Sequence, residues 1–171
     1  MATSFQGVMD NVLVFAPAAE REKAEYSEIY NEHCHRIYSL AFYLTDNELT
    51  AEQLATNTFL RAFAGSATPC ADNVDAAFLS EARDLMPIGL LTLSNPVSAD
   101  VTNIRGNVKR VHLERAVVQL PSTEKLVFLW HDVDSYEHSR IARLLGITEE
   151  ESKLALHAAR MRVRQLVAEM I

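Results

Sequence analysis

The sequence has few cysteines and no long hydrophobic run, and each absence excludes a class of protein. Only Cys34 and Cys70 are cysteines among its 171 residues, too few for a disulfide scaffold and typical of a reducing cytoplasm. No apolar run approaches the roughly 18 residues of a membrane span, so no membrane partner is expected. No basic residue precedes the short apolar run at 12–15, which argues against a signal peptide. These absences predict a cytoplasmic protein.

Strand patterns, repeats and catalytic signatures are lacking as well. We find no alternation of apolar and polar residues, no Ser/His/Asp set, no paired carboxylates and no glycine-rich phosphate loop. The sequence therefore predicts neither an enzyme nor a cofactor. The His-Cys-His run at 33–35 lies in a predicted helix, where adjacent side chains point about 100° apart and cannot converge on one metal ion. His131, Asp132 and Asp134 are close in sequence, but a turn explains them at least as well.

Charge is divided unevenly along the chain. The net charge is −7, and 49% of the residues are hydrophobic, enough to form a core. Residues 1–104 hold 14 acidic and 5 basic side chains, whereas residues 105–171 hold 9 acidic and 11 basic ones. The second half is therefore the better candidate for binding nucleic acid.

Helical periodicity predicts three helices in the first half. Apolar residues recur at steps of three or four over 22–45 and 50–63, and more weakly over 74–86. The sequence Thr50 to Gln53 fits a capping box that would open the second helix. Pro87 is expected to end or kink the third.

This pattern divides the chain into an arm, two helical domains and a linker. We expect an arm at 1–22, a first domain at 23–87, a linker at 88–107 and a second domain at 108–171. The linker is assigned because its residues lack a periodic apolar face. The predicted fold class is all-α, with two small helical domains and a helix-turn-helix in the second.

The helix-turn-helix is predicted from residues 135–164. Gly146 supplies the backbone freedom to leave a helix, and Thr148 followed by Glu151 fits a capping box for the next one. The second helix carries one apolar stripe, formed by Ser152, Leu156, Ala159, Val163 and Leu166. From pattern alone, an αα-hairpin of an ordinary helical bundle remains an equal alternative.

Two more helix starts are predicted upstream of this motif. Ser122 is expected to cap a helix over 123–131, directly after Pro121. Asp134 or Ser135 is expected to cap the first helix of the helix-turn-helix.

The residues of both halves resemble bacterial RNA polymerase sigma factors of the extracytoplasmic-function type. In the second half four motifs match that family in order. They are Leu120-Pro121, Ile141-Ala142, Leu145-Gly146-Ile147 and Ala159-Arg160. In the first half, Ala51-Glu52 and Phe59 are similar to the family's polymerase-docking helix.

The resemblance implies two partners, core RNA polymerase and promoter DNA. It implies that the helix over 50–63 docks on the polymerase through its outer residues Glu52, Gln53, Thr56 and Asn57. It implies that the second half recognises DNA through Ser135, Glu149, Glu150, Lys153, His157, Arg160 and Arg164. A solvated helix face is the alternative for that second set, and helix capping is the alternative for Glu151.

Several positions depart from the family pattern. Gln53 and Thr56 stand where the family has Asp and Gln, and Leu154 and Ala155 replace a polar and basic pair. Residues 65–104 hold one base, one aromatic and five acids, which offers little to single-stranded DNA. Two alternatives therefore stay open. One is a degenerate sigma mimic that binds a protein such as an anti-sigma factor, and the other is a plain helix-turn-helix repressor.

Overall fold

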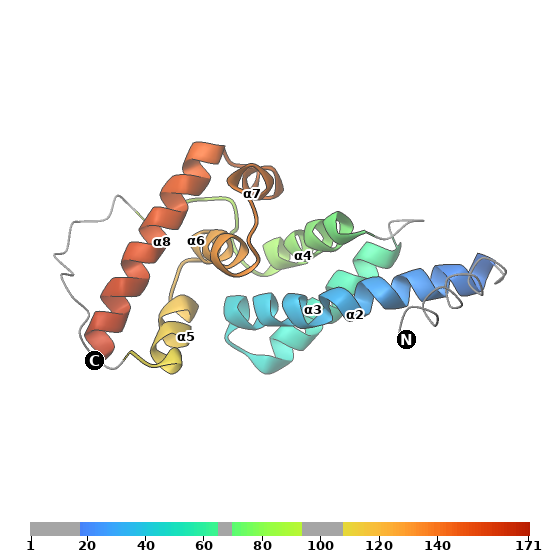
Figure 1. The fold of residues 1–171 in the computed structure, drawn as a ribbon, viewed down its shortest axis with the longest axis horizontal. Helices are drawn as coiled ribbons and strands as arrows, with labels where there is room; N and C mark the ends of the chain where they lie inside the picture. Colours follow the sequence, from blue (N-terminus) through green and yellow to red (C-terminus); the bar gives the residue numbers. More distant parts are fainter. Residues whose placement is uncertain (1–17, 65–69, 94–107) are drawn as a thin grey trace, which may run out of the picture.

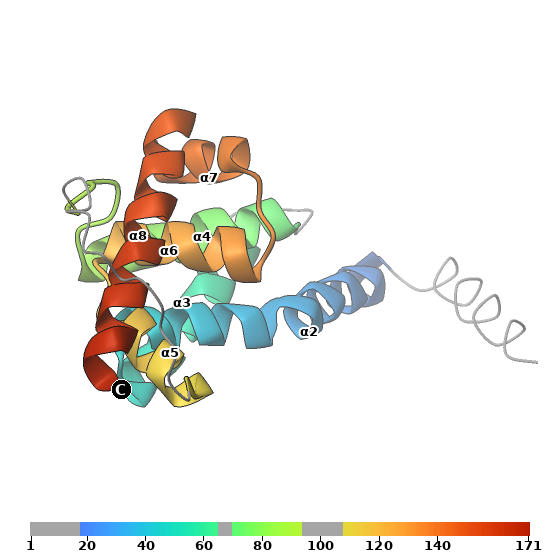
Figure 2. The same ribbon diagram turned by 60° about the vertical axis from the view of Figure 1, so that its left-hand side comes forward.

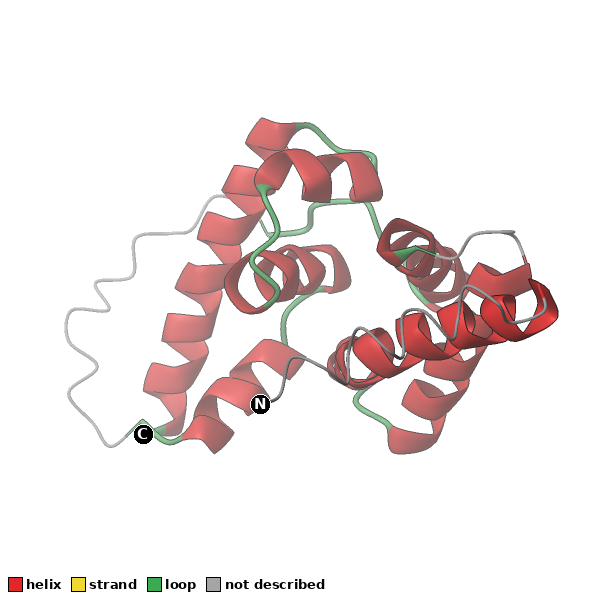
Figure 3. Ribbon diagram, turned by 45° about the vertical axis from the view of Figure 1, so that its right-hand side comes forward, coloured by secondary structure: helices red, strands yellow, loops and turns green. Residues whose placement is uncertain are grey.

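All regular elements of the computed structural model are helices. It describes residues 18–64, 70–93 and 108–171, with side chains from residue 23 onward. In these ranges helices are joined by loops and no strand occurs (Figure 3), so the predicted all-α class is confirmed. None of the described helices is long and apolar enough to span a bilayer. Most of the predicted arm, residues 1–17, lies outside the described ranges.

The described part of the first half consists of three helices, whose arrangement Figure 1 shows. They are α2 (Ala18–Thr45), α3 (Glu48–Ala64) and α4 (Ala71–Leu85). Helix α3 packs on both α2 and α4, and the side chains that meet between them include the buried Ile37, Leu54 and Phe78. The helices are those predicted from periodicity, although each begins two to four residues earlier than expected.

Asn47 caps helix α3, so the prediction of a capping box at Thr50 was wrong. The Asn47 Oδ1 atom accepts hydrogen bonds from the Thr50 backbone N at 2.9 Å and from the Thr50 Oγ1 at 3.1 Å. The Asn47 carbonyl also accepts the first helical bond, from the Ala51 N at 2.9 Å. Asparagine is as good an N-cap as threonine, and Asp46 at φ 50° turns the chain directly before it.

Five helical segments make up the second half. They are α5 (Arg110–Val118), α6 (Ser122–Phe128), the π-helix η1 (Leu129–Val133), α7 (His138–Leu145) and α8 (Glu149–Met170). Helix α8 lies across α5, α6 and α7 (Figure 2). The side chains beneath it include Leu126, Trp130 and Ile141, which are buried, as is Leu156 of α8 itself.

The predicted starts of α6 and α7 were each misplaced. Pro121 occupies the N-cap of α6 and Ser122 is its first residue. The N-cap of α7 is Glu137, not Asp134 or Ser135. The π-helical turn explains the second shift, because it extends the preceding helix to residue 133 and its closing bond runs from the Asp134 N to the Leu129 carbonyl at 3.0 Å.

The described part of the predicted linker is bound to α6. The Gly89 N donates to the Thr123 Oγ1 at 3.0 Å. The Thr92 N and the Leu93 N donate to one oxygen of the Glu124 carboxylate at 2.6 and 2.7 Å. Because Glu124 is fully buried, these bonds fix residues 89–93 on the second half. The division into two independent domains stays a prediction.

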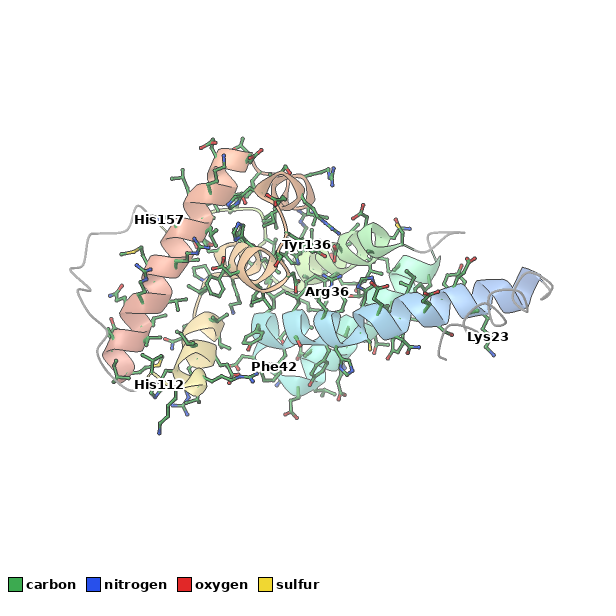
Figure 4. The ribbon with its side chains drawn as sticks, viewed as in Figure 1. Lys23, Arg36, Phe42, His112, Tyr136 and His157 are labelled. Atoms are coloured by element: carbon green, nitrogen blue, oxygen red, sulfur yellow. The ribbon has the colours of Figure 1, made fainter. Side chains whose placement is uncertain are left out.

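A buried charge cluster joins the two halves. Asp75 of α4 is fully buried and accepts hydrogen bonds from Arg36 at 2.7 Å, from the Tyr136 hydroxyl at 2.7 Å and from Arg140 at 2.9 Å. The Arg140 guanidinium also lies 3.9 Å from the centre of the Tyr136 ring. Figure 4 shows Arg36 and Tyr136 in the middle of the molecule, where the halves meet.

Candidate nucleic-acid interface

The turn between α7 and α8 has the geometry that its sequence predicts. Gly146 ends α7 in the left-handed conformation, at φ 73° and ψ 32°, and the N–H groups of Gly146 and Ile147 donate to the Ala142 carbonyl at 2.9 and 3.1 Å. The Glu151 N donates to the Thr148 Oγ1 at 3.1 Å, and the Thr148 N donates to the Glu151 carboxylate at 2.7 Å. The predicted capping box is therefore confirmed, and the hydrogen bonds that the Glu151 carboxylate accepts from the Thr148 backbone N and hydroxyl lower the pKa of Glu151.

The predicted inner stripe of α8 is buried against the rest of the second half. It comprises Ser152, Leu156, Ala159, Val163 and Leu166. Ile141 and Leu145 of α7 are buried on the facing side. The His138 Nδ1 lies 2.9 Å from the Ser152 Oγ, which adds a polar contact near the crossing. The two helices thus form a helix-turn-helix in which the opposite side of α8 is left exposed.

The residues predicted to contact DNA form one exposed row along α8, with a single exception. The row consists of Glu149, Glu150, Lys153, His157, Arg160 and Arg164, all exposed. Figure 4 shows His157 on the side of α8 turned away from the first half. Ser135 is exposed too, but it lies in the loop before α7, at φ 59°.

Lys153 is neutralised by acids of its own helix. Its ammonium lies 2.9 Å from a Glu150 oxygen and 3.4 Å from a Glu149 oxygen. The Glu150 hydrogen bond and charge raise the pKa of Lys153, and Lys153 in turn lowers the pKa of Glu150. A DNA phosphate would therefore have to displace these carboxylates before it could pair with Lys153.

Arg160 is held by Asp132 of the π-helix. The Arg160 Nε lies 2.9 Å from one Asp132 oxygen and the Arg160 Nη2 lies 2.5 Å from the other. This two-point pairing lowers the pKa of Asp132 and fixes α8 to η1. Within the described residues, His157 and Arg164 are the members of the row without a side-chain partner. Sequence analysis missed the role of Asp132, because nothing in the sequence links positions 28 residues apart.

The residues predicted to bind polymerase are exposed together on α3. They are Glu52, Gln53, Thr56 and Asn57. Leu54 and Phe59 of the same helix are buried, as expected. The structure thus brings the four predicted residues to one side of the helix.

A cleft that sequence analysis did not anticipate borders this set. It lies between α2 and α3, has a volume of about 590 Å³ and includes Glu52 and Thr56 in its wall. Its aromatic lining comprises Tyr30, Tyr38, Phe59 and Phe63. An aromatic cleft beside exposed polar side chains has the chemistry of a protein-binding surface.

Comparison with known families supports the helix-turn-helix assignment. Residues 110–163, from the start of α5 to the middle of α8, match the family model described as sigma-70, region 4. The matched segment is about a third of the 171-residue chain. The match supports a sigma-factor-like, DNA-binding and non-enzymatic role for this segment, with RNA polymerase and promoter DNA as its partners. No curated protein matches the chain.

Proposed function

We propose that the protein is a sigma-like transcription initiation factor of the extracytoplasmic-function type. Its first half binds core RNA polymerase through α3, and its second half recognises promoter DNA through α8. One observation carries the proposal: α8 follows a glycine turn, is capped by Thr148 and Glu151 and presents an exposed row of polar side chains, within the segment that matches region 4.

DNA recognition by this protein depends on attachment to the polymerase. In a helix-turn-helix the second helix enters the major groove and its first residues meet the base edges. Here those residues include Glu149 and Glu150, which phosphates repel. The intrinsic affinity is therefore weak and strongly dependent on salt. Attachment to polymerase raises the effective concentration of α8 near the promoter, so weak contacts still select a sequence.

The alternative is a sigma mimic that binds a protein, such as an anti-sigma factor, without recognising DNA. The pairing of Lys153 with Glu149 and Glu150, and of Arg160 with Asp132, favours it, because both bases are already neutralised. A sigma mimic would use the cleft between α2 and α3 for its protein partner and leave α8 solvated.

A footprint on upstream DNA separates the two functions. The purified chain with core polymerase is expected to protect promoter DNA, and Lys153→Glu is expected to abolish that protection while core binding is kept. Lys23→Glu is the matched control, because it makes the same charge change at the far end of α2, as Figure 4 shows. Binding of core polymerase without a footprint in the wild type would favour the sigma mimic.

The docking surface on α3 is tested separately. Thr56→Arg with Asn57→Arg is expected to abolish core binding, because both side chains are exposed and two bulky cations would be added to the docking face. Helical content, measured by circular dichroism, should stay unchanged. Failure of the wild-type chain to bind core polymerase would contradict the proposed docking.

A further inference from the structure

Two histidine rings stack beside the start of α8. His131 belongs to η1 and His138 is the first residue of α7. Their ring centres are 4.6 Å apart and their planes are inclined by 28°. Both side chains are half-buried. The pair therefore offers two titratable groups at one place in the helix-turn-helix.

The hydrogen bonds of His131 fix which of its nitrogens carries the hydrogen. The His131 Nδ1 lies 2.8 Å from the Asp132 Oδ1. Asp132 is ionised, since the hydrogen bonds from Arg160 lower its pKa, and an ionised carboxylate only accepts. The hydrogen therefore resides on Nδ1, and in the neutral ring Nε2 is an acceptor. Nε2 becomes a donor only when the ring takes up a second proton.

The pKa of His138 is lowered in the free protein. Burial comes first among the causes that lower the pKa of His138, followed by the charges of His131 and Lys153. Glu149 and Glu137 act in the opposite direction. Two imidazolium rings in contact repel each other, so the stacked pair resists holding both charges unless an anion binds.

The histidine pair borders the exposed row of α8. His138 contacts Ser152 of α8 at 2.9 Å, and the Asp132 that holds His131 also holds Arg160. In a helix-turn-helix the first helix crosses the DNA backbone while the second enters the groove. A phosphate at the edge of the groove would therefore meet the His138 ring at the start of α7 and the His131 ring stacked on it.

We propose that His131 and His138 form a proton-dependent phosphate-binding site for the DNA backbone. A phosphate accepts a hydrogen bond from the His131 Nε2 only when that nitrogen is protonated, so DNA binding takes up a proton. The inference rests on the proposed DNA binding. It adds a pH dependence beyond that of His157, the histidine of the row, whereas Lys153, Arg160 and Arg164 stay charged near neutral pH.

The test is the affinity of the full chain for a labelled duplex of mixed sequence, measured by fluorescence anisotropy at low salt between pH 5.5 and 8. Wild-type affinity is expected to rise as pH falls, by up to about tenfold per pH unit for one fully linked proton. His131→Gln should remove most of that rise. His131→Arg, which carries a permanent charge, should bind at pH 8 more tightly than the wild type does.

A control variant and a second readout make the test decisive. His35→Gln removes an exposed histidine of α2 and should keep the wild-type pH dependence. Titration calorimetry in buffers with different ionisation heats should show proton uptake on DNA binding by the wild type and little uptake by His131→Gln or His138→Gln. Circular dichroism confirms that each variant is folded.

The possible failures are distinguishable. Suppose that DNA binding shows the same pH dependence and the same proton uptake in the wild type, His131→Gln and His138→Gln. That result overturns the histidine site and leaves the proposed function intact. Absence of binding to any duplex at any pH, in the wild type and in His131→Arg alike, overturns the histidine site, and the footprint with core polymerase then decides the proposed function separately.

Discussion

The position of Lys125 in the fold determines its hydrogen bonds and its pKa. Its ammonium donates to the Tyr43 carbonyl at 2.8 Å and to the Val118 carbonyl at 2.7 Å, so it satisfies carbonyls near the ends of α2 and α5 at once. The side chain is 4% exposed. Burial lowers the pKa of Lys125 to about 8, against a weaker opposing effect of Asp46. An ordinarily exposed lysine thus becomes a titratable group of the interior.

This lowered pKa predicts that stability increases between pH 8 and 10. In that range the unfolded chain keeps the Lys125 proton and the folded chain releases it, so the free energy of unfolding rises with pH. The expected gain is about 2 kcal/mol. Above pH 10 the raised pKa values of Tyr43 and Tyr136 act in the opposite direction, because the folded chain holds their protons longer.

Urea unfolding at a series of pH values measures the effect, with Lys125→Met as the comparison. That variant should be less stable at every pH, because two buried carbonyls lose their donor. It should also lack the increase between pH 8 and 10. A wild-type curve that is flat across this range would contradict the assignment.

Ser135 provides a second prediction at the residue scale. Its φ of 59° lies in the left-handed region, which costs a non-glycine residue roughly 1–2 kcal/mol. Ser135→Gly should therefore raise the free energy of unfolding by up to about 1 kcal/mol, after the entropy that glycine loses on folding. Ser135→Ala retains the strain and should give no gain. Equal stability of the two variants in thermal melts would show that the backbone is relaxed there.

At the scale of elements, the start of α8 depends on its capping box. Thr148→Ala removes the acceptor of the Glu151 N and is expected to lower stability by about 1 kcal/mol. Thr148→Ser keeps a hydroxyl in the same position and should restore most of the loss. Urea unfolding followed by circular dichroism makes the comparison. A Thr148→Ala chain as stable as the wild type would mean that solvent replaces the cap.

Local signals explain which elements were predictable from sequence. Gly146, Thr148 and Glu151 act on their immediate neighbours, so their spacing was enough to predict both the turn and the cap. Asn47 and Thr50 are both competent caps three residues apart, and sequence alone did not decide between them. The π-helical turn at 129–133 has no local signature that we recognised, and it displaced the predicted start of α7.

Contacts between distant residues were beyond prediction. Arg160 and Asp132 are 28 positions apart, and Asp75 and Arg140 are 65 apart. From the sequence, each of these residues would be expected on a solvent-exposed face of its helix. Their pairing depends on how the helices pack. For the same reason the row on α8 was predicted correctly as exposed, while the neutralisation of Arg160 was not foreseen.

At the scale of the whole molecule, the structure and the predicted domain division lead to different expectations. Independent domains would unfold separately. The cluster around Asp75, however, places charges of both halves in one buried site. Without the Asp75 charge, Arg36 would keep Asp134 at 3.6 Å and Arg140 would keep Asp72 at 2.8 Å, so the expected cost is that of lost hydrogen bonds to a charged group, about 1.5–3 kcal/mol. The cluster should therefore make the stability of each half depend on the other.

Asp75→Asn tests that dependence, because Asn preserves the shape of the side chain and removes its charge. Trp130 is the single tryptophan of the chain and lies buried in the second half, so its fluorescence reports that half alone. If the halves are coupled, Asp75→Asn on α4 should lower the free energy of unfolding reported by Trp130 by about 2 kcal/mol. Wild-type transitions followed by Trp130 and by circular dichroism should coincide.

Asp84→Asn is the matched control for this measurement. Asp84 lies on the same helix and its ion-pair partner is Arg61 of the first half, so its loss should leave the Trp130 transition nearly unchanged. An unchanged Trp130 transition in Asp75→Asn, together with a lower stability of the first half by circular dichroism, would instead support two independent domains. In that case the charge cluster would be a contact that forms after each half has folded, and either half could bind its partner alone.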